Sequence, residues 1–211
     1  MTDHARAERR ALADLLDALG PDAPTLCADW TTSDLAAHLV IREGDPLGAA
    51  GILLPPLAGR TKERMTGLVG RLGYAELVDR FRQGPPSWSP ARLGAVDRAA
   101  NTVEFFVHHE DVRRAQPDWT ARDLPDDFED LLWRRVTSAG RMLFRRSAAG
   151  VLVARPDGAT ARVRKGEPTA VLSGLPSEIT LYMFGRRGVS RAEVVGPPAA
   201  VQALAHAPLG V

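Results

Sequence analysis

Glu104, His108 and Asp111 form the pattern with the clearest chemical potential in this sequence. On an α-helix, with about 100° between successive residues, these side chains fall within about 60° of one another. Apolar residues share that stripe, which indicates that it faces the protein interior. They are Ala100, Val107, Val112 and Ala115. A Glu and a His at i and i+4 on such a stripe can reach one metal ion held between helices, and zinc accepts both carboxylate oxygen and imidazole nitrogen.

A third ligand must come from another helix, and His38 is the candidate. It shares one mostly apolar face of a predicted helix with Leu35, Ile41 and Arg42. Three protein ligands leave one position open for water or substrate, which is the arrangement of catalytic zinc sites. Asp111 would lie behind His108 and orient its ring. We therefore expect His38, Glu104 and His108 to hold a divalent ion, zinc or a similar first-row metal.

Simpler interpretations of these residues stay open. His38 can be a hydrogen-bonded core histidine, and Glu104 with His108 can be a helix-stabilising pair. Three neighbours, His109, Glu110 and Asp111, can form a solvated face or local ion pairs.

Two further residues near these motifs are expected to have no chemical role. Phe106 falls on the outward side of its helix, where it would meet another helix or a second domain. Cys27 is the only cysteine, so it cannot form an internal disulfide. Since nothing near it in the sequence would activate it, we expect an inert buried thiol.

The first two thirds of the chain show the periodicity of helices. Leu12, Leu15, Leu16 and Leu19 repeat at helical spacing, and Thr31 stands three residues before Asp34 in the pattern of a capping box. We expect helices over about 4–19, 32–43, 60–83 with a break near 70–73, 91–115 and 125–146.

The pattern changes near residue 148. Val151 and Val153 alternate with their neighbours, and a turn at Pro156-Asp157-Gly158 precedes another alternating segment at 161–163, which indicates a hairpin. We expect a third strand at 170–172, a short helix from Pro176, a strand at 191–195 and a last helix at 198–205. The predicted boundary therefore separates a helical domain, 1–147, from a small α+β domain, 148–211.

Composition excludes several classes of protein. The 211 residues are 25% charged and 45% apolar, with a net charge of +1, so no global charge favours nucleic acid or anionic lipid. No segment reaches the roughly 18 apolar residues of a membrane span, and the N-terminus lacks the apolar region of a signal peptide. A cytoplasmic location is therefore expected.

Several motifs resemble the mycothiol-dependent maleylpyruvate isomerase-like family of actinobacteria, within the DinB-like superfamily of metal-binding helical bundles. The matching segments are Trp30-Thr-Thr-Ser-Asp34-Leu-Ala-Ala-His38, Glu104-x-x-x-His108-x-x-Asp111, Gly174-Leu-Pro-Ser-Glu178 and Phe184-Gly185-Arg186. Two longer segments, 84–90 and 106–115, resemble an uncharacterised metal-binding subgroup of that family.

The resemblance implies an α + α/β architecture: an N-terminal DinB-like four-helix bundle that holds the metal, followed by a sterol-carrier-like α+β domain. It also implies mycothiol, a low-molecular-weight thiol, as a cofactor. A basic residue of the second domain would help to bind the active-site ligands, and Arg186 and Arg187 are its candidates. Apart from the resemblance, Asp111 and Glu110 are the candidates for moving a proton.

The leading functional hypothesis is a metal- and thiol-dependent isomerase or S-transferase. The ion would bind the thiol as a thiolate, which would attack a small electrophile. The alternatives are a non-catalytic, metal-dependent protein that binds a small ligand and a metal-stabilised interaction module. The expected partners are a small thiol and an electrophilic substrate, with no nucleic acid or membrane, and the oligomeric state is left open.

Overall fold

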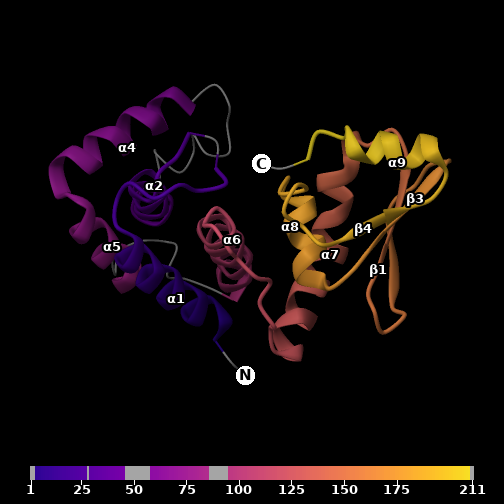
Figure 1. The fold of residues 1–211 in the computed structure, drawn as a ribbon, viewed down its shortest axis with the longest axis horizontal. Coiled ribbons are helices and arrows are strands. Elements are labelled where there is room, and N and C mark those ends of the chain that lie inside the picture. Colours follow the sequence, from indigo (N-terminus) through magenta and orange to yellow (C-terminus); the bar gives the residue numbers. More distant parts are fainter. Residues whose placement is uncertain (1–2, 28, 46–57, 86–94, 210–211) are drawn as a thin grey trace. The chain divides into compact units, whose positions relative to one another are not determined.

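The chain consists of two compact units, Met1–Thr120 and Ala121–Val211 (Figure 1). The computed structural model describes residues 3–27, 29–45, 58–85 and 95–209, with the backbone alone for 58, 60 and 95–100. The first unit is built from helices, and the second combines helices with a small mixed sheet. The expectation of a helical part followed by an α+β part is therefore confirmed.

The helices of the first unit match the predicted segments. They are α1 (His4–Leu19), α2 (Thr32–Gly44), α4 (Ala58–Leu72), α5 (Tyr74–Gln83) and α6 (Ala95–Arg113). Gly73 separates α4 from α5, which confirms the expected break. Its φ angle of 72° is a backbone conformation that favours glycine. Residues 46–57 and 86–94, including most of the family-like segment 84–90, lie outside the described residues.

A capping box fixes the beginning of α2. The Thr31 side chain accepts the backbone N–H of Asp34, and the Asp34 carboxylate accepts the backbone N–H of Thr31. This confirms the predicted motif and satisfies two backbone donors at the helix start. The box therefore anchors the helix that carries His38 in its second turn.

Apolar residues of α1, α2, α5 and α6 form one core in the first unit. Its fully buried members include Leu12, Leu16, Leu35, Leu39, Leu77, Phe81 and Phe105. One ion pair is built into this core: Arg9 of α1 contacts Glu43 of α2, and its guanidinium group lies 4.5 Å from the ring centroid of Phe105. The core holds α2 and α6 beside each other, which matters because these two helices carry the predicted ligands.

The second unit contains a four-stranded sheet in the order β2-β1-β3-β4. The strands are β1 (Gly150–Ala154), β2 (Thr160–Arg164), β3 (Thr169–Ser173) and β4 (Glu193–Val195). The predicted hairpin is the antiparallel β1–β2 pair, while β3 is parallel to β1 and antiparallel to β4. The predicted short helices are α8 (Pro176–Met183) and α9 (Pro198–Ala205).

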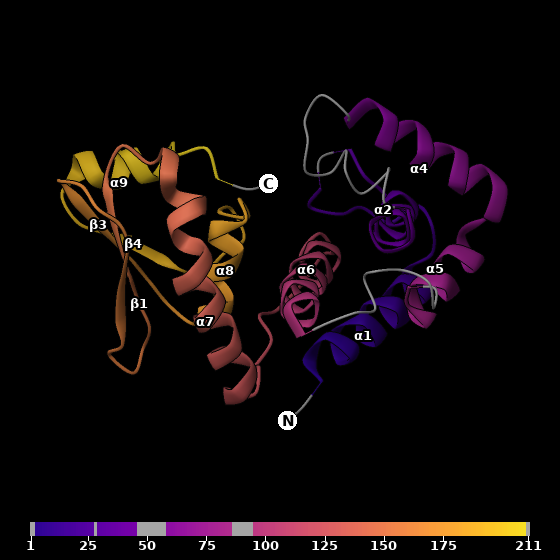
Figure 2. The same ribbon diagram turned by 180° about the vertical axis from the view of Figure 1, so that it is seen from behind.

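Helix α7 (Asp126–Leu143), which continues as a 3-10 turn at Phe144–Arg146, belongs to the second unit. It lies beside α8 in both views (Figures 1 and 2), and Val136 enters the core formed by the sheet. At Gly140 a Cβ atom would come within 2.6 Å of Val163, so helix and strand approach closely. The division lies between Thr120 and Ala121 rather than at the expected 147/148, because α7 packs on the sheet.

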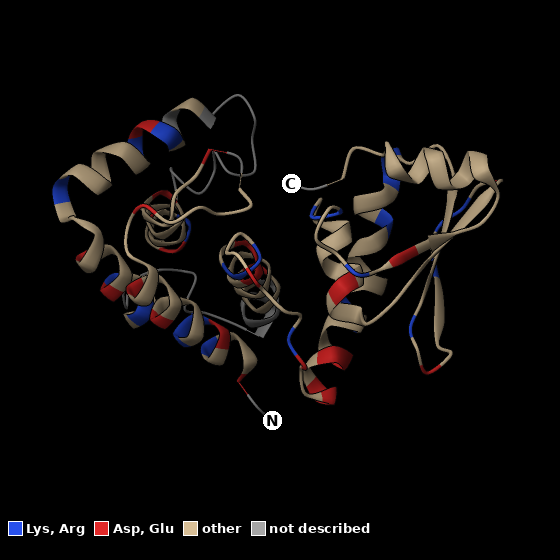
Figure 3. Cartoon of the chain, viewed as in Figure 1, with Lys and Arg blue, Asp and Glu red and all other residues tan. Residues whose placement is uncertain are grey.

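Figure 3 shows charged residues on helices of both units. Acidic residues cluster in the first turn of α7 and a basic residue stands in its last turn, as the helix dipole favours. None of the helices in the described part of the chain is long and apolar enough to span a bilayer.

Candidate metal centre

Helices α2 and α6 bring His38, Glu104 and His108 together. The three potential ligand atoms all lie within 4.8 Å of one another. Glu104 Oε1 is 3.2 Å from His108 Nε2 and 3.7 Å from His38 Nε2. A tetrahedral ion with bonds of about 2.0–2.1 Å spaces its ligands by about 3.3 Å, so these separations fit one ion.

His38 supplies the observation that points most directly to a ligand. Its Nε2 atom is buried and has no hydrogen-bond partner, although the side chain lies in the same cluster as Glu104. A buried polar atom without a partner is costly, and most such atoms in folded proteins are satisfied. The ring is held in place by Trp30, whose centroid lies 4.9 Å away, and by His108 at 5.2 Å. A cation at this point would satisfy the atom.

Asp111 lies behind His108, as expected for a residue that orients a ligand. Its side chain is fully buried, and Oδ2 is 3.0 Å from His108 Nδ1. A carboxylate at Nδ1 fixes the proton there and leaves the Nε2 lone pair for a metal. Asp111 therefore supports the ligand role of His108 and is not part of a solvated face.

Cys27 joins this cluster, a contact that the sequence did not predict, and its inertness stays a prediction. Its Sγ donates a hydrogen bond to Asp111 Oδ2 at 3.2 Å and lies 3.9 Å from His108 Nδ1. Cys27, His108 and Asp111 form a second group whose ligand atoms lie within 4.8 Å of one another. Sequence reasoning missed this contact because Cys27 stands in a loop, where no periodicity indicates its direction.

Arg42 gives the centre a positive neighbour. Its Nε is 3.2 Å from Glu104 Oε1, and its guanidinium also donates to the Asn101 side chain at 2.6 Å. Arg42 stands one helical turn after His38, so the two side chains share one face of α2. That spacing is the feature of the sequence that places Arg42 near the centre. About a fifth of each side chain in the Arg42–Glu104 pair remains exposed, which marks this side as the more open one.

The charges of the cluster follow from these contacts. Burial alone would raise the pKa of the Glu104 carboxyl, but the hydrogen bond to His108, the nearby ring of His38 and the charges of His108 and Arg42 hold that pKa well below its ordinary value. Burial would lower the pKa of His108, but its bonds to Asp111, Cys27 and Glu104 hold that pKa well above the ordinary value. Burial is the main cause of the lowered pKa of His38.

The outward-pointing residues of α6 are buried, so the alternative of a solvated face does not hold for them. His109 Nδ1 is 2.9 Å from the buried carboxylate of Glu8 in α1. Glu110 is 1% exposed and forms ion pairs with Arg113 and Arg114. These are the local ion pairs that the other alternative predicted. Phe106 is buried as well. Residues on several sides of α6 are buried, so the helix does not have a single buried stripe. Of its two histidines, His108 is the one that lies beside His38.

Arg186 and Arg187 make contacts within the second unit. Arg186 donates to the carbonyl of Phe184 at 2.5 Å. Arg187 donates to the carbonyls of Ala205 and Ala207, at the end of α9, and lies over the ring of Tyr182. These bonds stabilise the end of a helix, and the role of either arginine in ligand binding stays a prediction.

Comparison with solved structures identifies a full-length fold match. A crystal structure of the mycothiol-dependent maleylpyruvate isomerase aligns over 92% of this chain and 93% of that chain, with a TM-score of 0.54 and 18% identity. This chain shares that enzyme's fold. A histidine-to-alanine mutant of the enzyme aligns over the same shares with a TM-score of 0.53 and 17% identity. The sequence matches no protein-family model and no curated protein.

Proposed function

We propose that this protein binds one divalent first-row metal ion, zinc in the simplest case, through His38, Glu104 and His108. The observation that carries the proposal is the buried, unpartnered Nε2 of His38 beside the Glu104 carboxylate and the His108 ring. Two neutral imidazoles and one carboxylate form a ligand set found in catalytic zinc sites, where a fourth position stays open.

We further propose that the centre activates a low-molecular-weight thiol, mycothiol or a close relative, for isomerisation or S-transfer on a small electrophile. Two observations support this: the ligand set, and the shared fold with an enzyme described as mycothiol-dependent. When bound, the ion supplies a Lewis acid that favours the thiolate form of a thiol. The chain's other residues position the ligands and the substrate around it.

Asp111 and Trp30 have positioning roles in this proposal. Asp111 accepts the Nδ1 proton of His108 and so keeps the tautomer in which Nε2 faces the centre. Trp30 packs against His38 and limits rotation of its ring. Both contacts hold a ligand in place before any ion binds, which lowers the conformational cost of binding.

Arg42 is the residue that we assign to the substrate. When the Glu104 carboxylate binds a metal ion, it no longer occupies the guanidinium group of Arg42. That group is then available to bind a substrate on the more open side of the centre. Arginine binds carboxylates in a bidentate manner, so an electrophile that carries a carboxylate would be oriented by this residue. Arg42→Met should then raise KM for an acidic electrophile while leaving the metal content unchanged.

Cobalt substitution tests the thiol proposal. A thiolate ligand adds a sulfur-to-cobalt charge-transfer band, so mycothiol should produce this band in the cobalt-loaded protein. Cys27→Ser is the necessary control, because Cys27 Sγ lies 3.9 Å from His108 Nδ1 and could itself give such a band. The band should persist in Cys27→Ser and disappear in His108→Gln. Turnover of an electrophile with no band for any thiol would mean that the ion activates water, and the thiol proposal would be wrong.

A further inference from the structure

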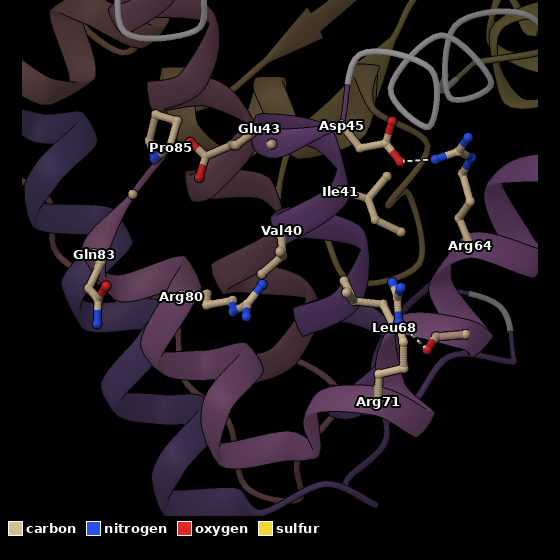
Figure 4. A pocket seen from close by; sticks show the side chains of 13 residues that line it. Val40, Ile41, Glu43, Asp45, Arg64, Leu68, Arg71, Arg80, Gln83 and Pro85 are labelled. Atoms are coloured by element: carbon tan, nitrogen blue, oxygen red, sulfur yellow. Dashed lines mark hydrogen bonds and ion pairs between the residues drawn. The ribbon is translucent and has the colours of Figure 1, made fainter. Parts of the chain in front are cut away.

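A cavity lies in the first unit between α2, α4 and α5 (Figure 4). Its volume is about 1050 Å³, which is enough for a drug-sized organic molecule. None of the proposed metal ligands lines it. Val40 of α2 lies in its wall and points about 200° away from His38 around the helix, whereas Ile41, which also lines the cavity, shares the face of His38. The cavity is therefore lined by residues other than the proposed metal ligands.

The wall of this cavity combines an apolar surface with charge. Val40, Ile41, Leu68 and Pro85 supply the apolar part. The charged residues are Arg64, Arg71 and Arg80 with Glu43 and Asp45. Arginines therefore outnumber the carboxylates in the wall.

Both wall carboxylates already have arginine partners. Glu43 is buried and contacts Arg9 of α1, which does not line the cavity. Asp45 contacts Arg64, and this ion pair is drawn in Figure 4. The positive charges of Arg71 and Arg80 are therefore not neutralised by the carboxylates of the wall.

Arg71 and Arg80 are the groups available to a ligand. The Nε atom of Arg71 donates to the carbonyl of Gly67 at 3.2 Å, and within the described ranges no carboxylate lies in ion-pair contact with its guanidinium group. Arg80 pairs with Glu76 on its own helix, and both side chains are about half exposed. Such an exposed i,i+4 pair is weak and is easily exchanged for another anion. Figure 4 shows both arginines extending toward the space beside Val40 and Leu68.

We propose that this cavity binds a small organic anion: a carboxylic acid with an apolar body. The carboxylate would bind the guanidinium groups of Arg71 and Arg80, whose planar donors match a carboxylate. The apolar body of the ligand would pack against Val40 and Leu68. This is a binding site distinct from the proposed thiol-activating centre, and it does not depend on a metal.

Two glycines of α4 allow the cavity to be filled without a change of charge. Gly67 lines the cavity, and a Cβ atom there would meet nothing within 4 Å. Gly70, one turn further along the same helix, also has nothing within 4 Å of a Cβ position but does not line the cavity. Gly67→Phe should therefore occupy the cavity, and Gly70→Phe is its matched control.

Isothermal titration of the full-length protein with 2-naphthoate and with its neutral amide, 2-naphthamide, tests the proposal. Naphthoate should bind with one-to-one stoichiometry, and naphthamide should bind about tenfold more weakly because it lacks the charge-assisted hydrogen bonds. Arg71→Ala should weaken naphthoate binding by about the same factor. Arg10→Ala, at an exposed arginine of α1, and Gly70→Phe should not change it, whereas Gly67→Phe should abolish it.

Any one of three results would overturn the proposal. They are no binding of naphthoate, equal binding of acid and amide, or unchanged binding in both Arg71→Ala and Gly67→Phe. His108→Gln, which should lose the metal, must still bind naphthoate. If naphthoate binding disappears with the metal in that variant, the anion binds at the metal centre and the separate site does not exist.

Discussion

Asp111 contacts two side chains at the proposed metal centre, the proposed ligand His108 and the thiol of Cys27. Only the first contact bears on the metal, because it fixes the ring of a ligand. Loss of such an orienting carboxylate typically costs 10–100-fold in metal affinity. Asp111→Asn should therefore weaken zinc binding by about that factor, measured by competition with a chelator of known affinity.

Cys27→Ser provides the matched comparison for Asp111→Asn. A serine hydroxyl can also donate to Asp111, so the carboxylate stays in place and zinc affinity should change by less than about threefold. A large loss of affinity in Cys27→Ser with little loss in Asp111→Asn would reverse the assignment. Cys27 would then be a ligand, and the second group of Cys27, His108 and Asp111 would be the metal site.

Protonation of His108 makes metal binding dependent on pH. Burial lowers the pKa of this ring, but hydrogen bonds to Asp111, Cys27 and Glu104 outweigh it, so the pKa lies well above the ordinary value. The metal-free ring therefore keeps its proton to a higher pH than an ordinary histidine does, whereas a ligand nitrogen must be free. Zinc should displace a proton, and its apparent affinity should rise with pH until the raised pKa is passed.

Calorimetric titration with zinc at neutral pH in two buffers of different ionisation enthalpy measures this proton. The apparent enthalpy should differ between the buffers in proportion to their ionisation enthalpies. The pH dependence of the unfolding free energy of the metal-free protein gives an independent check that the pKa of His108 is raised. A raised histidine pKa stabilises the fold fully below the unfolded value of about 6.5, and this stability is lost as the pH rises through the folded pKa. Equal zinc enthalpies in both buffers would contradict a protonated His108.

At the scale of elements, α6 shows both what a helical pattern predicts and what it omits. The i, i+4 spacing of Glu104 and His108 was enough to place both beside His38. The same pattern left open whether His109 and Glu110 form a solvated face or local ion pairs. In the structure both are buried and form ion pairs with Glu8 and Arg114, respectively. Buried ion pairs have the composition of a solvated face, so sequence alone does not separate the two.

Helix α7 shows a second limit of sequence patterns. The change from helical to alternating periodicity placed the first strand at Val151 and Val153, and both residues lie in β1. It could not show which unit α7 joins, because an amphipathic helix has the same pattern whether it packs on helices or on a sheet. The deciding feature is Gly140, where α7 approaches β2 too closely for a Cβ atom.

Gly140→Ala should destabilise the second unit. The added methyl group would come within 2.6 Å of Val163, and overpacking of this kind costs about 1–3 kcal/mol. Gly70→Ala is the matched control, because its methyl group meets nothing within 4 Å inside helix α4, where alanine should stabilise by about 0.5–1 kcal/mol. Urea denaturation followed by circular dichroism measures both changes, and a neutral Gly140→Ala would contradict the close packing.

At the scale of the whole molecule, the division at Thr120/Ala121 predicts which fragment folds. A fragment of residues 121–211 keeps α7 with the sheet and should unfold cooperatively on heating. A fragment of residues 148–211 lacks Val136, together with the partly buried Trp133 and Leu143, and so loses one side of its core. Nuclear magnetic resonance spectra of both fragments test this, and dispersed signals from 148–211 alone would restore the boundary that the sequence pattern indicated.

The most direct test of the metal centre uses two adjacent histidines. His108 and His109 are both buried, and each contacts a carboxylate, Asp111 and Glu8 respectively. Only His108 belongs to the group with His38 and Glu104. The substitutions His108→Gln and His109→Gln therefore remove a buried imidazole in the same part of the same helix, and they differ in whether a ligand is lost.

The measurement is the metal content of the purified full-length protein and of these two variants, by elemental analysis, with circular dichroism to confirm that each variant is folded. We predict about one divalent ion per chain in the original protein and in His109→Gln, and loss of most of the metal in folded His108→Gln. Retention of a full ion by folded His108→Gln, or equal loss from both variants, would contradict a metal centre formed by His38, Glu104 and His108.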